Sequence, residues 1–116
     1  MDTIQYDDFK KLDIRMGKIL KVEVVEDADK LLRCQVDVGD RDKEGNIVPR
    51  QILSGIREYI EEPESLVGEM FPYLVNLEIR TIRGFESQGM ILAGKYENTL
   101  MLLRPSEDVP PGTPIS

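Results

Sequence analysis

The sequence contains no histidine and a single cysteine, Cys34, among its 116 residues. A lone cysteine cannot form a disulfide within the chain. The missing side chains also exclude zinc sites built from cysteine and histidine, the Ser-His-Asp triad and the Cys-His dyad. Chemistry that relies on carboxylates, including oxygen-ligated metal ions, stays open, because the chain holds 22 aspartates and glutamates.

Long apolar runs are absent as well. No stretch approaches the ~20 apolar residues that a membrane-spanning helix needs. The first residues, Met1-Asp2-Thr3, do not begin a charged and then apolar leader. We therefore expect a cytoplasmic protein with no membrane partner. The apolar content of 41% and the length of 116 residues suit one domain with one core.

Positive charge is in deficit, with 15 lysines and arginines and a formal net charge of -7. A partner with a phosphate backbone usually requires a basic surface. The charges are segregated along the chain, however. Residues 46–57 contain Arg50 and Arg57 and no acid, whereas residues 23–29 and 58–69 are rich in acid. A local basic surface on an acidic body is therefore permitted, although composition alone does not establish it.

Alternation of apolar and polar residues predicts a chain made mostly of strands. In the clearest strand, Leu32, Cys34, Val36 and Val38 point one way, which places Cys34 in the core. Val22 and Val24 are likewise expected to share a face. The predicted strands cover residues 14–25, 32–38, 47–53, 70–77, 90–93 and 100–103. Helical turns are predicted at 6–12, 57–60 and 63–68, and a loop at 80–89.

The number and spacing of these strands favour a closed barrel. A sandwich of the immunoglobulin type is the alternative, but it needs about seven strands. Pro49 interrupts the third predicted strand, which indicates an edge or a bulge.

Three stretches read together resemble the tRNA-binding domain family. They are residues 12–19 (LDIRMGKI), 27–39 (DADKLL followed by VDVG) and 75–90 (VNL followed by RGFESQGM), and Ser54-Gly55-Ile56 falls at the matching place. The resemblance covers roughly residues 9 to 115. Similar domains occur in methionyl-tRNA synthetases, as free-standing dimeric tRNA-binding proteins and in an export-associated chaperone.

The resemblance implies an all-β OB-fold, a five-stranded Greek-key barrel with short helical turns and a C-terminal extension. The single domain would span residues 1–116, with a helical turn in 1–12. The extension, residues 98–116, resembles the segment through which free-standing members dimerise. The resemblance implies a homodimer that binds tRNA and has a methionyl-tRNA synthetase catalytic subunit as a possible partner. It implies no catalytic residue, no metal and no cofactor.

The resemblance also implies a set of binding residues. A functional lysine is expected at Lys30, and Arg80 and Arg83 would pair with phosphate or stack on an unpaired base. Asn76 and Ser87 would add uncharged hydrogen-bonding groups. The predicted tRNA-binding residues are Lys30, Arg33, Arg50, Ser54, Asn76, Arg80, Arg83, Ser87 and Met90.

Each of these residues has a structural alternative. Lys30 can balance Asp27 and Asp29, and Arg80 and Arg83 can pair with Glu78 and Glu86. Asn76 and Ser87 can cap backbone groups, and a methionine such as Met90 is more commonly a core residue. Phe85 is expected either to stack on a base or to cover the barrel end.

The sequence departs from the family pattern at two places. Members often carry Lys-His-Pro where this chain has Val24-Val25-Glu26, and Lys-Pro-Arg-Lys where it has Glu78-Ile79-Arg80-Thr81. Two cations of the second motif are missing. Each lost phosphate contact flattens the salt dependence of binding by roughly one unit of slope.

The leading hypothesis is therefore non-catalytic, shape-directed tRNA binding that assists an aminoacyl-tRNA synthetase of the methionyl type. A protein-binding chaperone or scaffold of the same fold is the alternative, favoured by the acidic body and the missing cations. An enzyme is a distant third reading, in which Asp27 and Asp29, or Glu61, Glu62 and Glu64, hold a hard cation.

Overall fold

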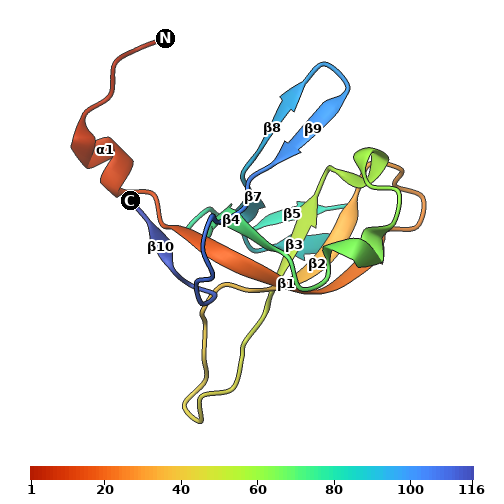
Figure 1. Ribbon diagram of the computed structural model, residues 1–116, viewed down its shortest axis with the longest axis horizontal. Coiled ribbons are helices and arrows are strands. Elements are labelled where there is room, and N and C mark those ends of the chain that lie inside the picture. Colours follow the sequence, from red (N-terminus) through yellow and green to blue (C-terminus); the bar gives the residue numbers. More distant parts are fainter.

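In the computed structural model, which describes residues 1–116, one long strand organises the sheet. Strand β1 (Ile14–Val24) pairs antiparallel with β2 (Leu32–Asp37) through its second half and with β4 (Met70–Leu74) through its first half. Strand β3 (Arg50–Ser54) extends the sheet beyond β2, and β7 (Met90–Ile91) extends it beyond β4. The strand order is β3-β2-β1-β4-β7 (Figure 1).

The two ends of this sheet meet and nearly close it into a barrel. The amide of Gln88 donates to the carbonyl of Gln51 at 2.8 Å, and the amide of Leu53 donates to Oγ of Ser87 at 3.0 Å. These bonds join β3 to the segment that leads into β7. The all-β, OB-type barrel predicted from the sequence is confirmed.

Alternate residues of the strands fill the barrel interior. Cys34 is 2% exposed, as predicted, and lies among the buried side chains of β2 and β4. Burial in this apolar environment raises the pKa of the Cys34 thiol to about 12, so the thiol stays protonated. The core residues are Ile19, Val22, Leu32, Cys34, Val36, Val38, Ile52, Ile56, Leu66, Phe71, Tyr73 and Val75.

A β-bulge interrupts β1 and resets its alternation. The register with β2 shifts between Ile19 and Lys21, so Leu20 has no partner across the strand pair. Ile19 and Val22 both point inward, at 1% and 5% exposure. Val22 and Val24 pair with Cys34 and Leu32 and share a face, as predicted. Val24 ends the strand and is nevertheless 51% exposed.

Several strand limits differ from the predicted ones. The third strand begins at Arg50 instead of residue 47, because residues 38–49 form a loop that projects from the barrel (Figure 1). Residues 80–89, predicted as a loop, contain a hairpin of β5 (Arg80–Ile82) and β6 (Phe85–Ser87). The predicted sixth strand is β9 (Thr99–Leu102), which pairs only with β8 (Ala93–Tyr96) in a second hairpin.

Helical structure is limited to short segments close to those predicted. Helix α1 covers Tyr6–Lys10, and two 3-10 helices, η1 (Arg57–Tyr59) and η2 (Pro63–Leu66), connect β3 to β4. The longest of these has five residues, so no helix of the structure has the length and apolar character needed to cross a bilayer.

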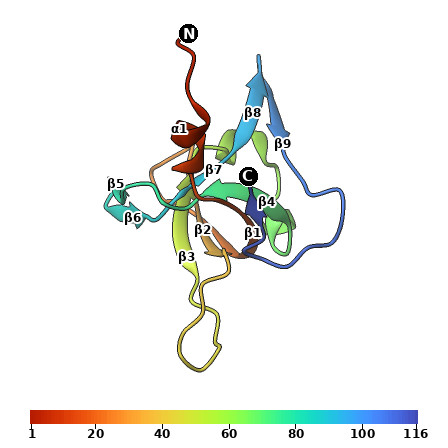
Figure 2. The same cartoon turned by 90° about the vertical axis from the view of Figure 1, so that its left-hand side faces the viewer.

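The C-terminal segment folds back along the barrel. Strand β10 (Pro114–Ile115) pairs with the start of β1, on the side that β2 occupies further along. Gly112 and Gly39 approach so closely that a Cβ added to Gly39 would lie 2.8 Å from Cα of Gly112. Figure 2 shows the β5–β6 hairpin and the segment before β10 on opposite sides of the barrel.

Candidate nucleic-acid interface

Two connections meet at one end of the barrel: the loop of residues 25–31 between β1 and β2, and the β5–β6 hairpin between β4 and β7. A small hydrophobic cluster, separate from the main core, joins them to β3. Its buried members are Val25, Ala28 and Leu53, and its partly buried members are Leu31, Ile82 and Phe85. In OB-folds, these connections and the outer face of the second and third strands are where oligonucleotides bind.

The β5–β6 hairpin turns at Arg83-Gly84, between the paired residues Ile82 and Phe85. Both turn residues have positive φ, 53° for Arg83 and 84° for Gly84, as a type I′ turn requires. Glycine adopts this conformation freely, but a left-handed backbone costs an arginine about 1 kcal/mol. The hairpin therefore carries Arg83 at its tip in a conformation that is unfavourable for the arginine backbone.

Arg83 and Lys30 line the same surface pocket, which has a volume of about 210 Å³. The other lining residues are Asp27, Ala28, Asp29 and Leu31. Both cations are exposed, and neither lies within 4.0 Å of a carboxylate oxygen. The structure thus brings these two predicted residues together and leaves their charges unpaired, although Asp27 and Asp29 lie close by.

Arg80 begins the same hairpin and is also exposed. Its side chain forms no ion pair and no hydrogen bond. It therefore does not pair with Glu78 or Glu86, its two expected alternative partners. Its backbone pairs with Ser87, at the end of the hairpin opposite the tip. Arg80, Arg83 and Lys30 are therefore three unpaired cations on the two adjoining connections.

Arg33 and Arg50 are engaged by other parts of the chain. Nη2 of Arg33 lies 2.8 Å from Oε2 of Glu23, and its guanidinium carbon lies 4.5 Å from the ring centroid of Phe85. The hydrogen bond from Arg33 lowers the pKa of Glu23 below its usual value. Nε of Arg50 lies 2.8 Å from Oδ2 of Asp40, and its Nη1 donates to backbone carbonyls, including that of Gln88 at 3.3 Å.

The uncharged predicted residues have structural partners or are buried. Oδ1 of Asn76 accepts the amide of Asp13 at 2.9 Å, and its Nδ2 donates to the carbonyl of Lys11 at 2.7 Å. These bonds tie the N-terminal segment to the barrel. Oγ of Ser87, which is 1% exposed, accepts from Leu53 and donates to the carbonyl of Gly89 at 3.1 Å. The capping alternative therefore describes both side chains.

Ser54 and Met90 lie at the ends of barrel strands. Ser54 is 4% exposed at the end of β3, where its backbone pairs with that of Leu32. Met90 is half-buried at the start of β7 and pairs with Leu74. Neither side chain joins the group formed by Lys30, Arg80 and Arg83.

Two glutamines that sequence reasoning missed lie on the outer face of β2 and β3. Gln35 and Gln51 are cross-strand partners, and Nε2 of Gln35 lies 3.3 Å from Oε1 of Gln51. Gln51 also donates to the carbonyl of Glu86 at 3.0 Å, so it contacts the β5–β6 hairpin. The signal was present in the alternation of β2, which places Gln35 two residues from Arg33 on the outward face.

Comparison with known proteins agrees with this geometry. Residues 14–114 match the family described as "Putative tRNA binding domain". The chain belongs to the tRNA-binding domain family. The family is a binding domain and not a catalytic one, and the resemblance found in the sequence motifs is confirmed.

Proteins similar to this tRNA-binding domain include a synthetase, a synthetase-related protein and a chaperone. The domain is 46% identical over 114 residues to a methionine--tRNA ligase of Xylella fastidiosa strain M23, covering 97% of this chain and 15% of the ligase. A MetRS-related protein from Pyrococcus horikoshii superposes with a TM-score of 0.87 at 32% identity, covering all of both chains. The chaperone CsaA from Bacillus anthracis superposes with a TM-score of 0.82 at 28% identity, covering 99% and 100% of the two chains.

Proposed function

We propose that this domain binds tRNA without catalysing a reaction, through the end of the barrel where the 25–31 loop meets the β5–β6 hairpin. The observation that carries the proposal is the meeting of Lys30 and Arg83 at one pocket, with Arg80 on the same hairpin and all three unpaired. Membership of the tRNA-binding family supports it. Of the other six predicted residues, Arg33 and Ser87 contact the cluster beneath this surface, and the remaining four are assigned no contact with RNA.

Recognition by shape follows from the chemistry available at this surface. Lysine and arginine bind phosphate oxygens irrespective of sequence, and a guanidinium does so through two parallel hydrogen bonds. The deep major groove of an RNA helix hides base edges from side chains, so a folded RNA is read largely through its backbone, its 2′-hydroxyl groups and its unpaired bases. Gln35 and Gln51 are suited to hydrogen bonds with sugar or base.

The salt dependence of binding should reflect the small number of unpaired cations. Three phosphate contacts correspond to a slope of log K against log salt of about −2 to −3. The net charge of -7 opposes a polyanion at longer range. Binding is therefore expected to be modest at physiological salt and to strengthen clearly at low salt.

The experiment is a filter-binding titration of purified protein with bulk tRNA at low and moderate salt. Saturable binding that weakens with salt supports the proposal, and its absence at both salt concentrations ends it. Arg83→Ala should weaken binding while the thermal unfolding curve stays intact. Lys43→Ala is the matched control, because Lys43 is exposed on the projecting 38–49 loop.

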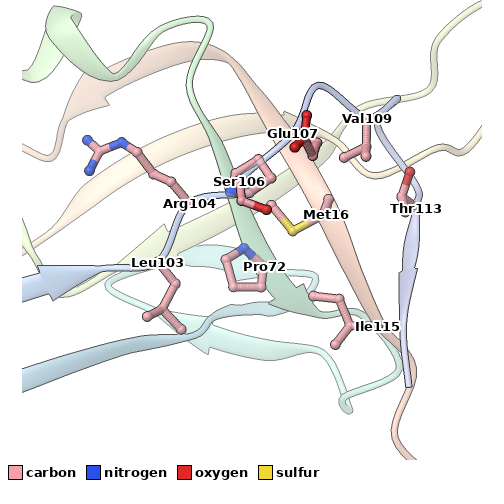
Figure 3. A pocket seen from close by; sticks show the side chains of 10 residues that line it. Met16, Pro72, Leu103, Arg104, Ser106, Glu107, Val109, Thr113 and Ile115 are labelled. Atoms are coloured by element: carbon pink, nitrogen blue, oxygen red, sulfur yellow. The ribbon is translucent and has the colours of Figure 1, made fainter.

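We further propose that residues 98–116 mediate a homodimer. A pocket of about 490 Å³ lies between this segment and the barrel, and Figure 3 shows Met16 and Pro72 facing Leu103 and Ile115 across it. Met101 and Leu103 of the segment are 56% and 40% exposed. A second copy would cover these apolar groups in an isologous interface. Sedimentation should show a dimer that Leu103→Glu dissociates.

A cytoplasmic role in supplying tRNA affinity to a methionyl-tRNA synthetase is the proposed context. The curated relatives that this chain matches include methionine--tRNA ligases, and the chain spans about 15% of the length of these ligases. Added affinity from a tethered binding module can act without new catalytic contacts. Addition of this protein should lower the apparent KM of such a synthetase for tRNA and leave kcat unchanged.

A second candidate function is binding of unfolded polypeptide. The likeness to the chaperone CsaA and the apolar pocket of the C-terminal segment favour it. Suppression of aggregation of a denatured test protein, unaffected by excess tRNA, would support this function. Competition by tRNA would instead indicate that both ligands need the same surface.

A further inference from the structure

The side chain of Arg33 connects the outer face of the barrel to the β5–β6 hairpin. It projects from β2, and its guanidinium carbon lies 4.5 Å from the ring centroid of Phe85, the first residue of β6. A guanidinium over an aromatic face is attracted by the negative potential of the ring. Phe85 directly follows the Arg83-Gly84 turn, so this contact lies close to the hairpin tip.

Phe85 also belongs to the small cluster that joins the two RNA-facing connections. Within that cluster, Val25 and Ala28 come from the 25–31 loop and are 5% and 3% exposed. Leu53 of β3 is the cross-strand partner of Arg33, so the two side chains lie side by side beneath the hairpin. The position of Phe85 therefore fixes the loop that carries Lys30 relative to the hairpin that carries Arg83.

Glu23 holds Arg33 in this place. The two residues are cross-strand partners on β1 and β2, with Nη2 of Arg33 2.8 Å from Oε2 of Glu23. Oε1 of Glu23 lies 3.4 Å from Nζ of Lys21. The side chain of Arg33 is only 26% exposed. A phosphate would have to displace Glu23 before it could reach this guanidinium, which distinguishes Arg33 from the unpaired cations.

We propose that Arg33 is a positioning residue for RNA binding: held by Glu23, it covers Phe85 and keeps the β5–β6 hairpin against the 25–31 loop. Lys30 and Arg83 then keep the spacing at which they act on one RNA backbone. This inference rests on the proposed function, and it replaces the earlier expectation that Arg33 itself contacts tRNA.

The direction in which tRNA affinity changes when Glu23 is removed distinguishes two roles for this residue. If Glu23 were a bystander, its removal would take a negative charge away from the RNA surface and strengthen binding. If it holds Arg33, its removal loosens the hairpin and weakens binding. Glu86 provides the matched control, because it is an exposed carboxylate on β6 that forms no ion pair.

The experiment measures the dissociation constant for bulk tRNA as a function of salt for Glu23→Gln, Arg33→Met, Glu86→Gln and Arg83→Gln. We expect Glu23→Gln and Arg33→Met each to weaken binding about two- to fivefold, the range a cation–π contact supports, without changing the salt slope. Glu86→Gln should bind as tightly as the parent or more tightly. Arg83→Gln should lower the magnitude of the slope by about 0.7 to 0.9.

Further variants separate positioning from general destabilisation. Arg33→Lys retains a cation that can pair with Glu23 and lie over Phe85, so it should recover most of the affinity that Arg33→Met loses. The double variant Glu23→Gln/Arg33→Met should bind no worse than either single variant, because the two residues act as one unit. Tighter binding by Glu23→Gln, or a slope change in Arg33→Met equal to that of Arg83→Gln, overturns the inference.

A measurement without RNA keeps the inference separate from the proposed function. In the NMR spectrum of the free protein, the ring current of Phe85 should shield the side-chain protons of Arg33, and Glu23→Gln should reduce this shielding and shift the amides of residues 82–86. If shielding is unchanged in Glu23→Gln, Glu23 does not hold the stack and the inference fails. If the parent protein shows the shielding and Glu23→Gln reduces it, but the parent binds no tRNA, the proposed function fails and Glu23 and Arg33 only hold the hairpin in place.

Discussion

The β5–β6 and β8–β9 hairpins have similar turn conformations and similar cation–aromatic contacts but different surroundings. Each turns through a charged residue in the left-handed region, with φ 53° for Arg83 in β5–β6 and 53° for Glu97 in β8–β9. Each also has a cation lying over an aromatic ring, Arg33 over Phe85 in one and Lys95 over Tyr59 in the other. The backbone and the anchoring chemistry are thus nearly the same.

The hairpins differ in packing and in charge. The β5–β6 hairpin lies on β3 through the small hydrophobic cluster, whereas β8–β9 projects from the barrel, with Tyr96 76% exposed near its tip (Figure 1). The tip of the first is a cation beside Lys30, and the tip of the second is an anion. Backbone strain by itself therefore does not mark a nucleic-acid site. The proposed site differs in that packing holds its strained cation, Arg83, beside a second cation, Lys30.

Charge reversal at the two tips should give the largest difference between the hairpins. Arg83→Glu removes a charge-assisted phosphate contact and places a carboxylate beside the RNA, so tRNA affinity should fall at least about tenfold. Glu97→Lys should leave affinity within about twofold, because its hairpin lies outside the proposed surface. Equal effects of the two reversals in the same titration would mean that RNA senses only the total charge.

Removal of one aromatic ring from each hairpin tests the packing difference. Phe85→Ala should lower the free energy of unfolding by about 1–3 kcal/mol, because its ring packs in the cluster and under Arg33. Tyr96→Ala should change it by less than about 0.5 kcal/mol, because that side chain is largely solvated. Urea unfolding measures both. A Tyr96→Ala effect as large as that of Phe85→Ala would show that Tyr96 itself is buried in solution, which would extend the proposed dimer interface of residues 98–116 to the tip of this hairpin.

Relief of backbone strain should separate stability from binding. Asn-Gly is the preferred type I′ turn, so Arg83→Asn should stabilise the fold by about 0.5–1 kcal/mol while weakening tRNA binding. Glu97→Gly relieves the same kind of strain in the other hairpin and should leave tRNA affinity unchanged. Thermal unfolding and RNA titration of both variants test this. If Arg83→Asn gains stability and retains full affinity, Arg83 does not contact RNA.

The sequence indicated the barrel more reliably than the roles of individual polar residues. Alternation through Cys34 and Val36 marks a strand with one buried face, and such strands together determine the fold. The β5–β6 hairpin was missed because its strands have three residues each, too few for a period to show, and because its turn is Arg-Gly instead of Asn-Gly. Only one strand of the β8–β9 hairpin was predicted, because strands of four residues are also too short to show a clear period.

The candidate site was predicted in part because the family resemblance supplied it. Lys30 and Arg83 are 53 positions apart, and no local pattern indicates that they share a pocket. The structural roles of Arg50, Asn76 and Ser87 depend on backbone groups that the fold brings from distant positions, such as the carbonyl of Lys11 for Asn76. A side chain that bonds to a remote backbone group gives no sign of it in the sequence, so a functional and a structural polar residue look alike there.

The smallest expected difference is in the response of the two hairpins to pH. The hydrogen bond with Arg33 holds the pKa of Glu23 below its usual value, so this anchor acts fully above the unfolded pKa of about 4.5 and is lost as pH falls through the lower folded value. The hydrogen bond with Tyr59 raises the pKa of Lys95, so that anchor acts fully below about 10.5 and is lost as pH rises through the higher folded value. Amide exchange and chemical shifts should therefore show β5–β6 loosening in acid and β8–β9 loosening in alkali. Loosening of β5–β6 in alkali instead would mean that a group other than Glu23 holds Arg33, because arginine keeps its charge throughout this range.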